Sequence, residues 1–167
     1  GKKIKLYPDF QTGGKGQMGS RWKSSNGDNF LGTFFLKPSL SLSEAFALNM
    51  IVSLALLETV VELVNGDVKI KWPNDILVDG KKIAGILIEN KYKNGGLNAS
   101  FLGIGLNLNQ KRFAKFSRQG TSILKQTGIL VNSEEIVERI CFHLEQFYSL
   151  FALKGYETIN FLYHQEL

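Results

Sequence analysis

Within the segment KIKWPNDILVDGKKIAGILIEN, residues 69–90, four side chains could act together in chemistry: two ammonium groups, an amide and a carboxylate. These side chains are Lys71, Asn74, Asp75 and Lys82. Ammonium and amide groups can offset negative charge in a reaction between anions, and a carboxylate can take part in binding Mg²⁺. A surface turn and solvated lysines would explain each residue alone, so a functional interpretation depends on the group as a whole.

Pro73 should place the amide and the carboxylate at the end of a strand. Proline makes the preceding residue extended and cannot donate to a sheet ladder, so strand pairing should stop there. Asn74 and Asp75 then follow the break with free side chains. Asp75 could orient a lysine, hold a phosphate-bound Mg²⁺, or form only a surface salt bridge.

The strand expected over 82–90 follows a tight-turn signal at residues 79–80, Asp-Gly. Strict alternation puts Lys82, Ala84, Ile86 and Ile88 on one face and Ile83, Gly85, Leu87 and Glu89 on the other. Gly85 within an apolar strand suggests the close approach of a ligand or of backbone. If strands 68–72 and 82–90 are neighbours, both lysines of the opening group lie near the Pro73 corner.

Two further segments are rich in glycine. In GIGLNLN, one face of a strand would carry only small or polar residues, Gly103, Gly105, Asn107 and Asn109, which fits the floor of a ligand site. The polar stretch 11–29 holds GGKGQMGSR, whose backbone amides and two cations could cradle an anion. Its spacing matches neither a P-loop nor a dinucleotide-binding fingerprint, because no helix is expected to follow it.

Composition is that of a globular protein of one domain, 1–167. The chain is 44% hydrophobic, carries a net charge of +5, and has one cysteine, Cys141, so no internal disulfide is possible. The longest apolar run, 45–57, is too short to span a bilayer, and no signal peptide is visible. We therefore expect a cytoplasmic protein without a membrane segment, with a weak preference for anionic ligands.

The order of expected elements predicts an α+β fold, with a mixed, mostly antiparallel sheet and helices packed on one face. Strands are expected at 2–10, 30–37, 68–72, 75–79, 82–90 and 97–109, and helices at 42–64 and 134–153. Ser41 and Glu44 form a capping-box signal for the first helix, and Asn94-Gly95 is a second hairpin signal. His143 is expected on the surface of the second helix. Exposed edges near 97–109 could pair in a homodimer.

Four motifs taken in order, GGKGQMGSRW, KWPND, KKIAGILIE and GIGLNLN, resemble the biotin protein ligases over essentially the whole chain. The resemblance implies a catalytic domain similar to the core of class II aminoacyl-tRNA synthetases. It also implies a two-step reaction. ATP, with Mg²⁺, activates biotin to biotinoyl-5′-AMP, and the biotinyl group then passes to a lysine of the biotin carboxyl carrier domain of a carboxylase.

The resemblance also implies roles for individual residues. Lys82 is similar to the family's essential lysine, beside the biotin carboxylate and the α-phosphate, and Asp75 is the second catalytic residue and the metal ligand. The expected binding residues are Gln11, Gly14, Lys15, Gly16, Gln17, Trp22, Asn74, Gly85 and Asn107. Among them Gln11 and Gly85 would contact biotin, Trp22 would wall the ligand, and the amide of Asn74 would face ATP.

The sequence also departs from the family pattern. Gln17 and Ser20 stand where the loop commonly has arginines, so tight retention of the adenylate is in question. The chain is expected to lack an upstream biotin-contacting segment, a small C-terminal β domain and any N-terminal DNA-binding domain. Two alternatives stay open: a lipoate or octanoate ligase or transferase, and a non-catalytic module that binds a carrier or a phosphate.

Overall fold

The computed structural model describes residues 4–6, 22, 27–38, 40–113 and 120–167, and it contains one sheet. The strands are β1 (Ile4–Leu6), β2 (Asn29–Leu36), β3 (Leu40–Ser41), β4 (Val68–Lys71), β5 (Asp75–Val78), β6 (Lys81–Lys93) and β7 (Gly96–Asn107). They are ordered β1-β2-β7-β6-β5-β4, with β3 paired to β7, and every strand pair is antiparallel. An isolated parallel bridge joins Lys82 to Gly120.

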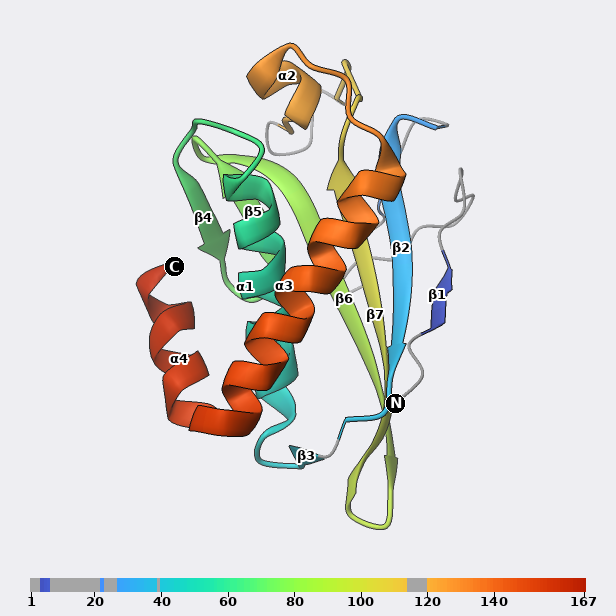
Figure 1. Ribbon diagram of the computed structural model, residues 1–167, viewed down its shortest axis with the longest axis vertical. Helices are drawn as coiled ribbons and strands as arrows, with labels where there is room; N and C mark the ends of the chain where they lie inside the picture. The colour runs from blue at the N-terminus through green and yellow to red at the C-terminus, as the bar shows by residue number, and fades with distance from the viewer. Residues whose placement is uncertain (1–3, 7–21, 23–26, 39, 114–119) are drawn as a thin grey trace.

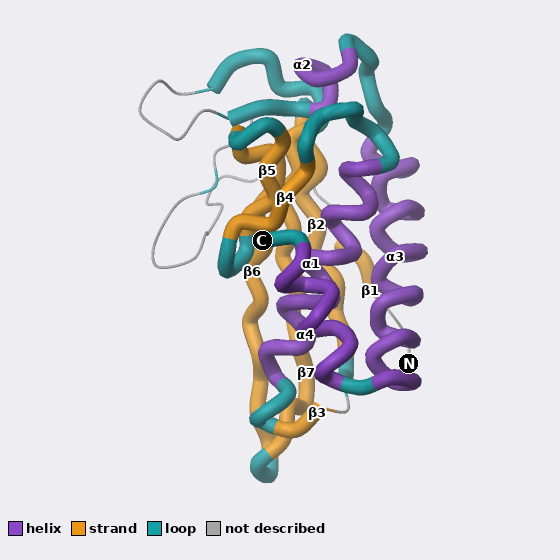
Figure 2. Tube along the Cα trace, turned by 90° about the vertical axis from the view of Figure 1, so that its left-hand side faces the viewer, coloured by secondary structure: helices purple, strands orange, loops and turns teal. Residues whose placement is uncertain are grey.

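Helices cover one face of this sheet, apart from a short one beyond its end, and no described helix lies on the other face (Figures 1 and 2). They are α1 (Ala45–Val61), α2 (Ile123–Thr127), α3 (Ser133–Lys154) and α4 (Tyr156–Gln165). The expected α+β fold with helices on one face is therefore confirmed. None of the helices in the described part of the chain has the length and apolar character needed to cross a membrane.

Helix α1 is the centre of the core because it is buried on almost every side. Its residues from Leu48 to Leu57 are all buried except Asn49. A helix that is apolar all round needs partners all round, and α1 packs on β4, β5 and β6 while α3 and α4 cover its other sides. The strands meet it with alternate apolar residues, such as Ile76 and Val78 on β5, each fully buried.

The boundaries of the first helix differ from the expectation. Ser41 does donate its backbone N–H and its hydroxyl to the Glu44 carboxylate, at 3.1 and 2.7 Å, as in a capping box. However, residues 42–44 form turns, and the helix begins at Ala45 rather than at 42. The second expected helix is confirmed as α3, where the Asn132 side chain accepts from the N–H of Glu134 at 2.9 Å. Helices α2 and α4 were not predicted.

Two expectations about strand neighbours are wrong. Strands β4 and β6 are not adjacent, because β5 lies between them. Strand β7 is an interior strand bonded to β2 and β6, so it offers no exposed edge for a dimer. Sequence patterns give the residues of a strand but not its neighbours, whereas the two hairpin turns were correct: Asp79 and Gly80, and Asn94 and Gly95, all have positive φ.

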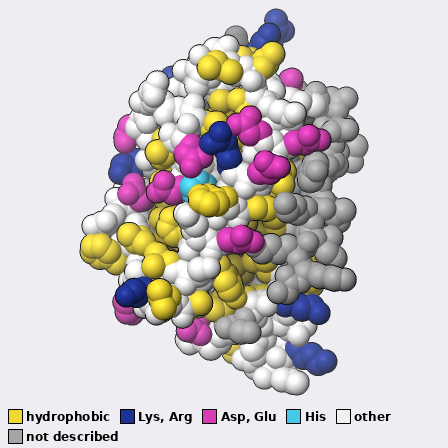
Figure 3. Space-filling view, viewed as in Figure 1, with side chains coloured by type: hydrophobic (Ala, Val, Ile, Leu, Met, Phe, Trp, Pro, Cys, Tyr) yellow, Lys and Arg dark blue, Asp and Glu magenta, His cyan; other side chains and the backbone are white. Residues whose placement is uncertain are grey.

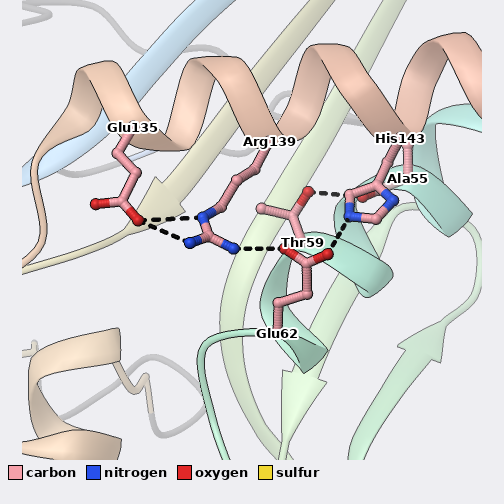
Figure 4. Close-up of polar contacts among 6 residues, drawn as sticks. All are labelled: Ala55, Thr59, Glu62, Glu135, Arg139 and His143. Atoms are coloured by element: carbon pink, nitrogen blue, oxygen red, sulfur yellow. Dashed lines mark hydrogen bonds and ion pairs between the residues drawn. The ribbon is translucent and has the colours of Figure 1, made fainter.

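A charged cluster joins the end of α1 to α3 (Figure 4). Glu62, just beyond α1, accepts from Arg139 at 2.6 Å and lies 3.0 Å from Nε2 of His143, while Arg139 also bonds Glu135 at 2.8 Å. His143 is only 6% exposed, so its expected place on the helix surface is wrong. On this face of the molecule, basic and acidic side chains surround a histidine among hydrophobic groups (Figure 3).

The charged cluster predicts how stability depends on pH. Burial alone would raise the pKa of the Glu62 carboxyl, but hydrogen bonds from Arg139 and His143 outweigh it and lower the pKa. A carboxyl with a lower pKa in the folded state stabilises the fold above its unfolded pKa, about 4.3, and that contribution disappears as the pH falls through the folded value. Glu62→Gln should therefore be less stable than the parent at pH 7, and the difference should shrink below about pH 4.

Urea unfolding at pH 7 and at pH 3 would measure this difference. The matched control is Glu138→Gln, because Glu138 is exposed on α3 and makes no ion pair with the residues that the structure describes. An equal effect of Glu62→Gln at both pH values would show that the charged cluster contributes nothing through ionisation.

Candidate functional site

Asp75 lies between two lysines at the edge of the helix-free face of the sheet. Its Oδ1 is 2.6 Å from Nζ of Lys82 on β6, and its Oδ2 is 3.6 Å from Nζ of Lys71 on β4. The carboxylate is mostly buried, with 14% of its side chain exposed. Lys71 and Lys82 are not on adjacent strands, but both contact Asp75 on the intervening strand β5. Two ammonium groups around one carboxylate leave a net positive charge, which favours an anionic ligand.

A β-bulge places Lys82 on the face that carries Gly85. Leu77 pairs with Lys82 and Ile76 pairs with Ala84, so Ile83 is an extra residue in β6. Ile83 and Ala84 are both fully buried, and the expected strict alternation from Lys82 onward is therefore wrong. An added Cβ on Gly85 would lie 3.2 Å from Nζ of Lys82, which shows that the two residues share one face. Bulges re-aim side chains in this way, often beside active sites.

The ring of Trp22 lies on a platform made by two glycines. Gly85 and Gly105 are paired across β6 and β7. A Cβ added to Gly105 would come within 2.6 Å of Cε2 of Trp22, and one on Gly85 would lie 3.0 Å from its Cζ3. Only glycine lets the ring approach the strands this closely. The group that approaches Gly85 closely is therefore the indole ring of Trp22, and Gly105 is a second glycine that this ring approaches.

Lys82 and Trp22 are also in contact with each other. The lysine Nζ is 5.4 Å from the centre of the indole ring, a cation–π geometry that contributes about 0.5–2 kcal/mol depending on solvation. The indole Nε1 is buried and has no hydrogen-bond partner among the residues that the structure describes. An unpaired buried donor costs about 1–3 kcal/mol. A ligand or water that accepts from Nε1 would remove this cost.

The two asparagines expected to bind nucleotide both have structural hydrogen bonds. Nδ2 of Asn74 donates to the carbonyl of Ile86 at 2.7 Å, and the N–H of Ile86 donates back to the Asn74 carbonyl at 2.9 Å. Nδ2 of Asn107, which is 5% exposed, donates to the carbonyl of Thr121 at 3.0 Å. Contact of either amide with a nucleotide stays a prediction.

Sequence analysis missed the chain segment that supports the backbone of Lys82. The N–H of Thr121 donates to the Lys82 carbonyl at 2.9 Å, beside the parallel bridge from Gly120. Asn107 holds the same segment through the Thr121 carbonyl. A contact between residues almost forty positions apart leaves no local pattern in the sequence. Asn107 therefore helps to place Lys82 whether or not it touches a ligand.

The remaining expected binding residues belong to the glycine-rich stretch. Gln11, Gly14, Lys15, Gly16 and Gln17 lie outside the residues that the structure describes. Their roles stay predictions. The described part of the site therefore consists of the Asp75 corner, the Lys82 bulge and the Trp22 platform.

The geometry of Asp75 also tests the expected metal role. Within the described ranges, no group of three or more His, Cys, Asp or Glu side chains could hold a metal ion. Mg²⁺ with phosphates needs only one or two carboxylates, so this alone decides nothing. However, both oxygens of Asp75 already face ammonium groups, which would repel a cation. This arrangement does not fit a metal ion at Asp75 and favours its role in orienting Lys82.

An antiparallel sheet with helices on one face carries a lysine–carboxylate pair and an indole on glycine on its other face, a chemistry suited to an anionic ligand with an apolar part. The sequence model of the biotin/lipoate A/B protein ligase family matches residues 8–107. The chain therefore belongs to the biotin/lipoate A/B protein ligase family. The match includes Trp22, Asp75, Lys82, Gly85 and Gly105.

Relatives with known names agree. The chain is 36% identical over 135 residues to the biotin–[acetyl-CoA-carboxylase] ligase of Paracoccus denitrificans, covering 77% of this chain and 55% of that protein. It is 28% identical over 161 residues to the bifunctional ligase/repressor BirA of Bacillus subtilis, covering 95% of this chain and 50% of that protein. The chain thus spans about half the length of the curated relatives it matches.

A solved structure shows the same fold. The biotin protein ligase of Aquifex aeolicus in complex with biotin and ATP superposes with a TM-score of 0.81. The match covers 98% of this chain and 68% of that one, at 24% sequence identity. The fold expected from the resemblance, that of biotin ligase catalytic domains, is therefore confirmed.

The Trp22 platform predicts a steric difference between two glycines of β7. Gly105→Ala should displace the indole, because the new Cβ would come within 2.6 Å of the ring. Gly103→Ala is the matched control, since its Cβ would meet only Leu87, at 3.3 Å or more. In a Trp72→Phe background Trp22 is the sole tryptophan, so its emission reports the change directly.

Gly105→Ala should shift the Trp22 emission toward that of a solvent-exposed indole, while Gly103→Ala should leave it unchanged. Identical spectra for the two variants would contradict the close packing of Trp22 on Gly105.

Proposed function

We propose that this chain is the catalytic domain of a biotin protein ligase, which activates biotin with ATP and transfers it to a carrier protein. The observation that carries the proposal is the contact of Lys82 with both Asp75 and Trp22, at 2.6 Å and at 5.4 Å from the ring centre. The ammonium of Lys82 thereby lies between the apolar ring of Trp22 and the carboxylate of Asp75. Biotin has an apolar body and a carboxylate, and it fits that junction.

In the first step, an oxygen of the biotin carboxylate attacks the α-phosphorus of ATP. A new O–P bond forms, the bond from the α-phosphorus to the bridging oxygen breaks, and pyrophosphate leaves. Both reactants are anions, so the barrier contains their repulsion. The ammonium of Lys82 offsets it and holds the two groups together, and Asp75 keeps that ammonium aimed at them.

In the second step, the neutral amine of a carrier lysine attacks the carbonyl carbon of biotinoyl-5′-AMP. An amide bond forms, the acyl–phosphate bond breaks, AMP leaves, and the amine loses a proton. The mixed anhydride is reactive toward water, so a site that excludes water protects it. The names of the relatives support a carboxylase as the source of the carrier.

Mg²⁺ enters this proposal with ATP. A metal ion bound with ATP would supply neutralisation of phosphate charge, and Asp75, which faces two ammonium groups, is not among the residues that would hold it. The lysine pairing of Asp75 supports an orienting role for this carboxylate. A cytoplasmic location and a homodimer are part of the proposal, the homodimer through a surface other than β7, which is an interior strand.

A lipoate or octanoate ligase is the second candidate because the family includes both kinds of enzyme. The same junction of lysine and apolar platform would suit either acid. The names of the relatives favour biotin. Calorimetry with biotin, lipoate and ATP separates the candidates: lipoate binding without biotin binding would support the second, and no binding of any of them would leave a non-catalytic module.

The proposed function predicts a large effect at Lys82 and none at its neighbour. Lys82→Ala should lower biotin-dependent pyrophosphate release at least a hundredfold, about 3 kcal/mol of transition-state stabilisation. Lys81→Ala removes the same charge from the adjacent, exposed residue and should stay within a few-fold of the parent. Circular dichroism of both variants checks the fold. A Lys82→Ala variant with nearly parental activity would remove Lys82 from the site.

Asp75→Asn tests how the carboxylate acts. It keeps the shape of the side chain but removes the charge that faces both lysines. If Asp75 orients Lys82, the rate of pyrophosphate release should fall roughly tenfold or more, while the Mg²⁺ concentration that gives half the maximal rate stays the same. A titration of activity with Mg²⁺ on the parent and the variant measures both quantities.

A strong increase in the Mg²⁺ requirement of Asp75→Asn would assign the carboxylate to the metal instead. Unchanged activity together with an unchanged requirement would leave the Asp75 pairing a purely structural ion pair.

A further inference from the structure

The carbonyl oxygen of Pro73, at the corner between β4 and β5, accepts hydrogen bonds from two helices. Nδ2 of Asn49 on α1 donates to it at 2.6 Å, and the hydroxyl of Tyr163 on α4 donates at 3.3 Å. These donors are 24 and 90 residues away in the sequence. The helix side of the corner is therefore fixed by side chains that have no other described polar partner.

Both donors are unusual in their surroundings. Asn49 is the one polar amide in α1, between Leu48 and Met50, which are fully buried. Tyr163 is 1% exposed, and burial raises the pKa of its hydroxyl, so the group stays protonated and able to donate. Asn49 itself is half-buried, whereas Tyr163 is buried, and a polar group removed from water costs free energy unless it is bonded. These two groups converge on one acceptor.

The opposite side of the corner is held by β6. Asn74 and Ile86 exchange two hydrogen bonds, of 2.7 and 2.9 Å. Asp75 follows directly and reaches Lys82 at 2.6 Å. The corner thus has one anchor on the helices and one on the strand that carries the lysine. Release of the helix anchor would let Asp75 move relative to Lys82 without disrupting the sheet.

We propose that Asn49 and Tyr163 are positioning residues, which hold the Pro73 corner so that Asp75 stays aligned with Lys82. We call the two hydrogen bonds from Asn49 and Tyr163 to the Pro73 carbonyl the clamp. The effect of the clamp on the reaction rests on the proposed function, whereas the existence of the clamp does not. The end of α4 reinforces the arrangement: the N–H of Ile70 donates to the Glu166 carbonyl at 2.7 Å, and Lys69 pairs with Glu166 at 3.3 Å. Helix α4 is thereby attached to the strand that leads into the corner.

The test uses the full-length protein with Asn49→Ala, Tyr163→Phe and the two combined. The matched control is Tyr156→Phe, which removes a hydroxyl from the same helix that makes no hydrogen bond to the described residues. Amide hydrogen exchange reports the clamp without any ligand. In the combined variant the Ile86 N–H, bonded to Asn74, should exchange about tenfold faster relative to the Leu54 N–H in the middle of α1.

Kinetics report the positioning. The combined variant should lower kcat for biotin-dependent pyrophosphate release about tenfold, with the KM for biotin within about twofold, because the Trp22 platform is untouched. In an Asp75→Asn background the same two substitutions should hardly change kcat, because the carboxylate that the clamp aligns is already absent. A purely structural role would give equal losses in both backgrounds.

Each outcome decides one point. Ile86 and Leu54 amides that accelerate together in the combined variant would overturn the clamp. A loosened corner with parental kcat would overturn the positioning role. A parent protein that releases no pyrophosphate with biotin would contradict the proposed function, and the exchange rates would still decide whether the clamp exists.

Discussion

The position of Asp75 between two ammonium groups is the constraint on which the site depends. A mostly buried carboxylate must be paired, because leaving it unpaired costs several kcal/mol. Lys71 and Lys82 provide that pairing from the strands on either side, at 3.6 and 2.6 Å. The order β4-β5-β6 places a lysine on each side of the carboxylate. This pairing also leaves one positive charge in excess, which is the property that an anionic substrate needs.

The remaining parts of the site meet at Lys82. The bulge at Ile83 turns the lysine away from the core, and the glycines of β6 and β7 let the indole of Trp22 approach it. Without the bulge, alternation would point the lysine at α1, where a charge has no partner. Strand β6 therefore contributes side chains both to the apolar core and to the polar face, and the extra residue Ile83 lets Lys82 lie on the polar face.

Local signals in the sequence predicted the elements well. Turn residues with positive φ gave both hairpins, the Asn132 cap gave the start of α3, and the KWPND corner gave the end of β4. The turns, the cap and the corner depend on neighbours in sequence, where propensity and spacing carry information. Most residues of the described site were named in advance, several of them only through the resemblance to the biotin protein ligases, whereas Gly105 was placed only on the ligand floor and the segment at Gly120 and Thr121 was missed.

The features that could not be predicted all depend on long-range contacts. The interior place of β7 follows from its pairing with β2, and the bulge in β6 follows from its register against β5. The burial of His143 follows from Glu62, 81 residues away. Asn49 shows the same limit at the site: it is a polar residue within an apolar run of the sequence, and only the fold brings the Pro73 carbonyl to its amide. A polar residue that breaks an apolar pattern is therefore a reason to search for a distant acceptor, because burial of an unpaired amide would be costly.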